Sequence, residues 1–354
     1  IFLNKMKDFK YLAAYSIPLT TVLSLIQDGW GMYSTAIFVF VIVPFADWVF
    51  GKGEKNLAPK EVQKKEPMRV FDYMLYLNVP VVFFILGWSL WNFSTIEYEL
   101  YEQIGLVLST GILLATNAIN VAHELGHRKG LFERTLSKLL YLPCLYMHFY
   151  IEHNFGHHLN VATKHDGASA KLNQNLYFFW IRSVTKQYID AWKKQRELLK
   201  KSSSSFFSFK NDMLCYTIIQ PLYLIVVYYT FTYKTMLFAI AIGVVSFLFL
   251  ETINYIEHYG LRRKKLSSGR YERVKEIHSW NSDHNIGRII LYELTRHSDH
   301  HFKSGKKYQI LDRFKESPQL PFGYPASILI SFIPPLWFKI MNDRIPKEMI
   351  LEKG

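Results

Sequence analysis

Four short histidine-rich segments carry the side chains best suited to chemistry in this 354-residue chain. They read HELGH at 123–127, HNFGHH at 153–158, NYIEHYG at 254–260 and HSDHH at 297–301. Together they hold nine of the 13 histidines, namely His123, His127, His153, His157, His158, His258, His297, His300 and His301. Because imidazole is the commonest protein ligand for transition metals, these nine residues are predicted to bind metal.

The spacing of the histidines indicates how they could share metal ions. Residues three or four positions apart lie on one face of a helix, so His123 and His127 can point at one metal, and so can His153 and His157. His297 can pair in the same way with either histidine of the final doublet. The adjacent His157 and His158 diverge by about 100°, so that doublet can serve two metals, or one metal and a hydrogen bond. Nine ligands exceed the needs of a mononuclear site, and a two-metal site is predicted.

Carboxylates near the histidines are predicted to orient them. Metal-bound histidines usually donate their second ring N–H to a carboxylate or a carbonyl. The predicted acceptors are Glu124, Glu257, Asp299 and Asp166, and direct ligation by one of them stays open. The other four histidines are interpreted as surface or capped residues: His148, His165, His278 and His284.

The elements that would position these residues are long apolar blocks, in a chain that is 50% hydrophobic. Blocks close to the roughly 20 residues that cross a bilayer predict membrane-spanning helices. Six are expected, at about 11–27, 31–50, 71–92, 104–122, 212–231 and 235–257. The fold class is therefore an all-α integral membrane protein with six transmembrane helices and a histidine-rich cytoplasmic cap at 123–211 and 258–354. Residues 1–354 are expected to form a single membrane-embedded domain.

The charges in the loops predict the orientation in the membrane. The segment after the second span is rich in lysine, whereas the loop after the third span carries Glu97, Glu99 and Glu102 without a basic residue. By the positive-inside rule the histidine-bearing side is cytoplasmic. The same rule accounts for most of the formal net charge of +13. Because nucleic-acid-binding motifs are absent, no nucleic-acid partner is expected.

A further basic amphipathic helix is predicted at 172–198. Aromatic residues such as Tyr177, Trp180 and Trp192 recur at helical spacing, with Lys and Arg between them. This pattern is typical of a helix lying at a membrane surface. Packing against the cytoplasmic cap remains an alternative. The basic start of the chain is followed by no small-residue cleavage site, so no cleavable signal peptide is expected.

The quoted blocks resemble the integral-membrane alkane 1-monooxygenases, which belong to the membrane fatty acid desaturase/hydroxylase-like superfamily. HELGH, EHNFGHH, NYIEHYG and RHSDHH resemble the histidine boxes and the additional signature of that family in order and spacing. The stretch HSWN at 278–281 is also similar to the family. Phe155 and Arg128 depart from the family pattern, but they lie between or beside ligands and leave every ligand in place.

The resemblance implies a function, a set of cofactors and partners. It implies O2-dependent terminal hydroxylation of medium-chain linear alkanes to 1-alkanols at a non-haem centre of two iron ions, held by the nine histidines. It implies an alkane substrate drawn from the bilayer and contact with membrane lipid. Electrons would come from rubredoxin, which a separate NAD(P)H-dependent rubredoxin reductase reduces. The location implied is the bacterial inner (cytoplasmic) membrane, with the metal site on the cytoplasmic side.

Three rival functions share parts of this pattern. A membrane fatty acyl desaturase or hydroxylase also uses several histidine boxes. An intramembrane zinc protease is suggested by HELGH, a literal H-E-x-x-H motif with Glu124 as the general base. That function leaves seven of the clustered histidines unexplained. A metal transporter usually binds its ion near the bilayer midplane, whereas these histidines gather at one end of the spans.

Overall fold

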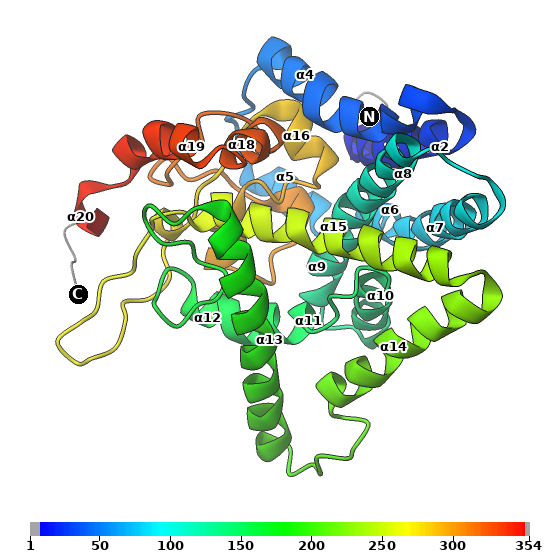
Figure 1. Cartoon of the computed structure of the whole chain (residues 1–354). Coiled ribbons are helices and arrows are strands. Elements are labelled where there is room, and N and C mark those ends of the chain that lie inside the picture. The colour runs from blue at the N-terminus through cyan, green and yellow to red at the C-terminus, as the bar shows by residue number, and fades with distance from the viewer. Residues whose placement is uncertain (1–7, 351–354) are drawn as a thin grey trace.

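The computed structural model describes residues 8–350, and every regular element in that range is a helix. The β-bridges within it are isolated pairs, such as the one between Lys265 and Tyr271. Figure 1 shows the long helices gathered into a bundle, with the shorter C-terminal helices packed at one end of α15. The predicted all-α class is thereby confirmed for the described residues.

Six helical segments are long and apolar enough to cross a membrane, as the sequence predicted. Their bounds are Phe9–Ile26, Gly29–Phe50, Val70–Thr95, Leu100–Gly126, Asp212–Thr230 and Tyr233–His258. The fourth span is longer than the expected 104–122, because the helix continues through the HELGH segment itself. That extension places the first histidines on a rigid helix rather than on a loop.

Several spans are built from consecutive elements. The first comprises η1 (Phe9–Tyr15) and α2 (Ser16–Ile26), and the second comprises η2 (Gly29–Tyr33), α3 (Ser34–Ile37), η3 (Phe38–Ile42) and α4 (Val43–Phe50). The third comprises α6 (Val70–Tyr76) and α7 (Asn78–Thr95), and the fourth comprises α8 (Leu100–Leu113), η4 (Leu114–Ile119) and α9 (Asn120–Gly126). The fifth and sixth are α14 (Asp212–Thr230) and α15 (Tyr233–His258).

The remaining helices lie outside the spans. Between the second and fifth spans they are α5 (Pro59–Lys65), α10 (Leu131–Tyr141), α11 (Phe149–Glu152), η5 (His153–His157), α12 (His158–Asn160) and α13 (Leu176–Lys201). After the sixth span they are η6 (Glu276–His278), α16 (Asn285–Ile290), α17 (His297–Phe302), η7 (Tyr308–Ile310), α18 (Tyr324–Ser331), α19 (Pro334–Met341), η8 (Asn342–Arg344) and α20 (Lys347–Ile350).

Three π-helical segments interrupt the α-helical geometry. They are η3 in the second span, η4 in the fourth span, and η5, which is the second histidine segment itself. A π-helical turn has a wider hydrogen-bond pattern and is frequent at functional sites. Here η4 leads directly into the HELGH helix, and η5 carries His153 and His157. Two of these three π-helical segments therefore adjoin or contain a histidine segment, whereas η3 does not.

Buried polar pairs join the spans to one another. The Asn117 side chain donates to the Asn78 side chain at 2.9 Å, which links the fourth span to the third. Ser24 donates to Ser109 at 3.1 Å, which links the first span to the fourth. Buried polar groups in a bundle without water must pair within the protein, so these contacts specify which helix faces lie together.

The long helix α13 corresponds to the amphipathic segment that was predicted at 172–198. It begins at Leu176, where the Asn175 side chain accepts a hydrogen bond from the Phe178 N–H at 2.9 Å. Its buried face includes Gln187, which donates to the Glu251 carboxylate of α15 at 2.9 Å. The opposite face is exposed, so α13 packs on the end of the sixth span along one side only.

Candidate metal centre

The nine predicted histidines converge into two adjacent clusters. The five-histidine cluster comprises His123, His127, His153, His158 and His300, and the four-histidine cluster comprises His157, His258, His297 and His301. Within each cluster one nitrogen from every ring lies within 4.8 Å of the others. Residues separated by up to 178 positions in sequence thus meet at the ends of the fourth and sixth spans, counting from His123 to His301 (301 − 123 = 178).

The distances between ring nitrogens match those of ligands around a common metal ion. In the five-histidine cluster, Nε2 of His153 lies 2.7 Å from Nε2 of His123 and 3.0 Å from Nε2 of His158. In the four-histidine cluster, Nε2 of His301 lies 2.9 Å from Nε2 of His297 and 3.2 Å from Nε2 of His157. Neighbouring ligands on metal–nitrogen bonds of about 2.1 Å are roughly 3.0–3.4 Å apart. The donor set therefore fits a metal ion in each cluster.

Unpartnered nitrogens provide a second indication of metal binding. Both ring nitrogens of His300 are buried without a hydrogen-bond partner among the described residues. Burial lowers the pKa of His127 to about 3, and burial together with the neighbouring imidazoles lowers the pKa of His300 and of His301 well below the usual range. Neutral imidazole is the form that binds metal, so these rings are prepared for a cation.

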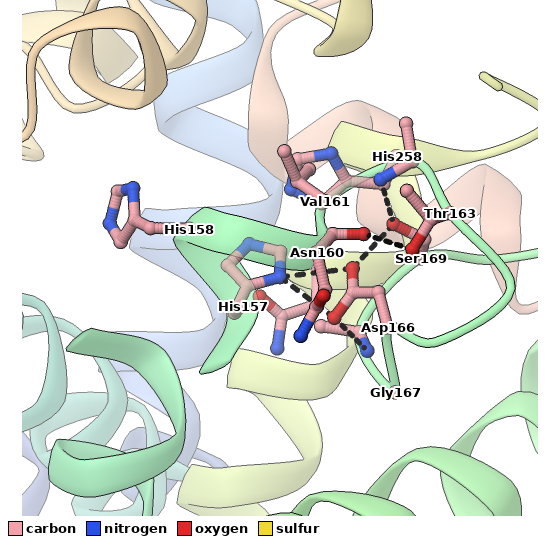
Figure 2. A network of polar contacts seen from close by, with 12 residues as sticks. His157, His158, Asn160, Val161, Thr163, Asp166, Gly167, Ser169 and His258 are labelled. Carbon is pink, nitrogen blue, oxygen red and sulfur yellow. Dashed lines mark hydrogen bonds and ion pairs between the residues drawn. The ribbon is translucent and has the colours of Figure 1, made fainter. Parts of the chain in front are cut away.

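The two histidine doublets divide between the clusters. Figure 2 shows His157 facing Asp166 while the ring of His158 points away from it. His300 and His301 separate in the same manner, because consecutive residues of α17 point about 100° apart. Of the two open pairings for His297, the structure places it with His301, and each doublet supplies one ring to each cluster. The expectation that His153 and His157 face one metal is wrong, because His153 Nε2 faces His123 and His158 whereas His157 Nε2 faces His301.

Close packing holds the segments in register. A Cβ atom at Gly126, within HELGH, would lie 3.1 Å from the Ser137 hydroxyl of α10, so α9 approaches α10 closely at this point. The stretch 278–281 connects the third and fourth histidine segments. Its Trp280 N–H donates to the Glu257 carbonyl at 2.8 Å, and its Asn281 side chain accepts from the Ser298 N–H at 2.8 Å. This stretch thus joins the end of α15 to the start of α17.

Two of the four predicted carboxylates contact the four-histidine cluster. The Asp166 carboxylate accepts from His157 Nδ1, with oxygens at 3.0 and 3.1 Å, and from the Ser169 hydroxyl at 2.5 Å. Burial alone would raise the pKa of Asp166, but its interactions with His157 and Ser169 hold it at about 2. Glu257 Oε2 lies 3.1 Å from His297 Nε2, which is the nitrogen that faces the other rings.

The other two carboxylates have different partners. Glu124 accepts from Arg128 at 2.7 Å and from the Tyr308 N–H at 3.2 Å. Asp299 accepts from Lys306 and from the Asp312 N–H, both at 2.6 Å. Their oxygens are therefore engaged by cations and backbone rather than by histidine rings, which differs from the sequence-based expectation. The same contacts leave Glu124 poorly placed for the general base of an H-E-x-x-H protease.

The four remaining histidines lie outside both clusters. His165 is exposed, and His284 Nδ1 lies 2.9 Å from the Ser282 hydroxyl. His148 is not a surface residue, because its ring is buried against Tyr146 with the ring centroids 4.3 Å apart. His278 is buried as well, and its backbone carbonyl lies 3.4 Å from His258 Nδ1. That carbonyl orients a clustered ring, a role that the sequence did not reveal.

An apolar cavity of about 50 Å³ lies among the spans, and none of the nine clustered histidines lines it. It is lined by side chains of the first, second, fourth and sixth spans and of α16 and α18, including Val39, Ala115, Ile253 and Ile328. Tyr324, also in its wall, donates its hydroxyl to Glu257 Oε1 at 2.7 Å. Since the other oxygen of Glu257 faces His297, a short polar path joins the cavity wall to the four-histidine cluster.

Comparisons with known proteins agree with this architecture. The model of the fatty acid desaturase family matches residues 103–329. The alkane 1-monooxygenase of Pseudomonas putida is 35% identical over 97% of this chain and 86% of its own length. Alkane 1-monooxygenase 1 of Alcanivorax borkumensis is 37% identical over 93% of this chain and 82% of its own length.

A more distant relative is named for a different substrate. The hydroxylase component of the xylene/toluene monooxygenase of Pseudomonas putida is 27% identical over 93% of this chain and 87% of its own length. The family match and the two closer similarities each extend over most of the chain and include all nine clustered histidines. The chain therefore belongs to the fatty acid desaturase family and, within it, to the alkane 1-monooxygenases.

Proposed function

We propose that this protein is a non-haem di-iron alkane 1-monooxygenase that hydroxylates the terminal methyl group of medium-chain linear alkanes. The observation that carries the proposal is the convergence of nine imidazoles in two clusters, with a polar path from one cluster to the wall of an apolar cavity. Two relatives that are 35% and 37% identical to this chain are alkane 1-monooxygenases, which supports the same activity. Imidazole accepts several transition metals, and iron is proposed because hydroxylation of an unactivated C–H bond by O2 requires a redox-active metal.

The protein's own side chains have defined tasks in this reaction. The histidines would hold two irons, which supply the oxygen chemistry when bound. Asp166 holds the ring of His157 in one orientation and keeps its Nδ1 proton in place. Because an alkane offers no hydrogen-bonding group, the cavity must orient it by shape alone. Apolar side chains such as Val39 and Ile328 line the cavity, and its volume of about 50 Å³ is smaller than an octane molecule, so these side chains must move apart to admit a whole chain.

The electron donor is proposed to be rubredoxin, reduced by a separate NAD(P)H-dependent reductase. The segment after the second span exposes Lys52, Lys55, Lys60 and Lys64, a basic surface suited to an acidic redox protein. The positive-inside rule supports an inner-membrane protein with this surface and the histidines on the cytoplasmic side. If rubredoxin-driven turnover falls steeply with ionic strength, electrostatic docking of rubredoxin on these lysines is supported. Turnover that does not depend on salt would rule out electrostatic docking.

Product analysis of the purified, iron-loaded protein tests the function. With octane, O2 and reduced rubredoxin, we expect 1-octanol as the main product by gas chromatography and mass spectrometry. The same preparation should leave acyl-chain substrates unchanged. Desaturated or hydroxylated acyl products without 1-octanol would instead assign the chain to the desaturase branch of its family. Zinc in place of iron, with no oxygen consumption, would overturn both assignments.

A further inference from the structure

A long segment near the C-terminus carries no charge although it lies outside the six spans. No Asp, Glu, Lys or Arg occurs from Pro318 to Phe338. The segment folds into α18 and α19, two helices of eight residues each, joined at Phe332 and Ile333. Because a single crossing needs roughly 20 helical residues, neither helix can span a bilayer. The segment is instead an apolar helical hairpin, named here the C-terminal hairpin.

The outer face of the C-terminal hairpin exposes large apolar side chains. Ile333 at its tip is 55% exposed, Leu329 is 41% exposed and Leu336 is 40% exposed. Phe322, just before α18, is 42% exposed. An apolar patch of this kind on a described surface indicates contact with a membrane or another molecule, because exposure to water costs about 25 cal/mol per Å².

The inner face of the hairpin is fixed to the end of the sixth span. Trp337 is buried, and its ring centroid lies 5.6 Å from those of Tyr255 and Tyr259, which stand on either side of the last turn of α15. Ile328 and Tyr324 of α18 line the apolar cavity. These contacts hold the hairpin at the level where the sixth span ends, which is the level of the bilayer surface.

Helix α13 extends the same apolar surface. The Tyr177 hydroxyl donates to the Phe332 carbonyl at 2.8 Å, and the ring centroids of Trp180 and Phe332 lie 5.9 Å apart. Beside these contacts α13 exposes Phe178 and Ile181, each by 69%. Tyr and Trp are enriched where a protein meets the boundary between lipid and water. Two segments that are distant in sequence thus meet at Phe332, and each exposes apolar side chains. Figure 1 shows α18 and α19 near the C-terminal end of α15.

We propose that the C-terminal hairpin inserts into the bilayer leaflet on the side of the metal centre, with acyl chains covering Leu329, Ile333 and Leu336. The lipid-facing surface of the spans continues onto the hairpin, and the first basic residue after the charge-free segment, Lys339, is exposed where headgroups would lie. The outer face of the hairpin then lies in lipid while its inner face lines the cavity. That last consequence rests on the proposed function, whereas the lipid contact does not.

Spin-label accessibility in proteoliposomes tests the proposal. The variants Ile333→Cys and Leu336→Cys are made in a Cys215→Ala background, where Cys144 is buried and stays unlabelled. Leu222→Cys, on the exposed face of α14, is the reference for lipid, and Ser268→Cys, on the exposed loop after α15, is the reference for water. The full-length protein is reconstituted into vesicles of phosphatidylethanolamine and phosphatidylglycerol. Collision rates are measured with O2, which concentrates in acyl chains, and with a water-soluble nickel chelate.

We expect labels at Ile333 and Leu336 to collide with O2 more often than the Ser268 reference and less often than Leu222, which lies in the middle of α14. They should collide with nickel several-fold less than the Ser268 reference. Nickel access equal to that at Ser268 would overturn the proposal, because the hairpin would then face water. Protection from both reagents would also overturn it and would indicate a second copy of the chain or another protein on this face. The collision measurement requires no enzyme turnover. A failure of the lipid-contact proposal can therefore be distinguished from a failure of the oxygenase assignment.

Discussion

The two histidine clusters differ in their surroundings more than in their ligands. All four rings of the four-histidine cluster are buried, and two of them contact the carboxylates of Asp166 and Glu257. In the five-histidine cluster, His123, His127 and His158 are half-buried. Buried Nδ1 atoms without a hydrogen-bond partner among residues 8–350 occur in both clusters, at His153, His158 and His300 in the first and at His301 in the second.

The difference indicates a division of labour between the two sites. A carboxylate that accepts the second ring N–H fixes the orientation of an imidazole and raises its basicity, as Asp166 does for His157. The four-histidine cluster is therefore expected to bind its metal more tightly. The five-histidine cluster has neutral ligands, and several of its rings are partly exposed to solvent. Its metal is therefore expected to exchange more readily. The polar path through Tyr324 and Glu257 joins the cavity wall to the four-histidine cluster.

Removal of one ring from either cluster should have the largest effect. His300→Ala and His301→Ala each delete a ligand of a different cluster, and we expect each to reduce bound iron from about two ions per chain to about one. Alkane turnover should fall to background in both variants, because both ions are required. Iron is measured by mass spectrometry of the purified protein.

The matched control for these variants is His165→Ala, which removes an exposed histidine outside both clusters. Its iron content and turnover should equal those of the parent protein. Full iron content in His300→Ala would contradict the assignment of that ring to a metal site, whatever its effect on turnover.

Loss of a carboxylate partner should have an intermediate effect. Asp166→Asn keeps the shape of the side chain and removes the charge beside His157, so metal affinity should fall by about 10–100-fold. Affinity is measured by competition with a chelator of known strength. Asp299→Asn is the comparison, because Asp299 contacts Lys306 and the Asp312 backbone. Equal losses of affinity in both variants would remove the distinction between the two kinds of carboxylate.

Chelation should remove the two ions in a fixed order. We expect the ion of the five-histidine cluster to leave first, since three of its rings are half-buried whereas all four rings of the other cluster are buried. Mössbauer spectra of protein loaded with ⁵⁷Fe would then lose one component before the other, and the component lost first should be the one missing in His300→Ala. Simultaneous loss, or retention of that component, would contradict the comparison.

The smallest effect is expected at the cavity wall. Tyr324→Phe removes the hydrogen bond to Glu257, which is worth about 0.5–1.5 kcal/mol, and should lower kcat/KM for octane by a few-fold. Iron content should stay unchanged, because Tyr324 touches no histidine ring through its hydroxyl. An unchanged kcat/KM would show that the hydrogen bond between Tyr324 and Glu257 has no role in turnover. A loss of iron would show that this contact is structural.

The spans and the nine histidines were predictable because both follow simple periodicity. Apolar blocks of membrane length identify the spans, and intervals of three and four identify the faces that carry the ligands. The division into five and four was not predictable, because it depends on how α17 and η5 meet in space. No spacing rule decides between His300 and His301 as the partner of His297.

The partners of the carboxylates were predicted only in part. Asp166 contacts a histidine ring as its proximity suggested, but Glu124 pairs with Arg128 one helical turn away. That pair at i and i+4 was visible in the sequence as a competing ion pair. Lys306, which engages Asp299, lies in a loop whose path the sequence does not specify. Tyr324 is 67 residues from Glu257, and nothing in its local sequence marks it as a contact.

The central claim is that the two histidine clusters each hold one iron ion. Anomalous diffraction from crystals of the purified protein, recorded on both sides of the iron absorption edge, tests it directly. We predict two iron peaks, one among His123, His127, His153, His158 and His300, and the other among His157, His258, His297 and His301. A single peak shared by both clusters, or peaks that appear only at the zinc edge, would contradict the account.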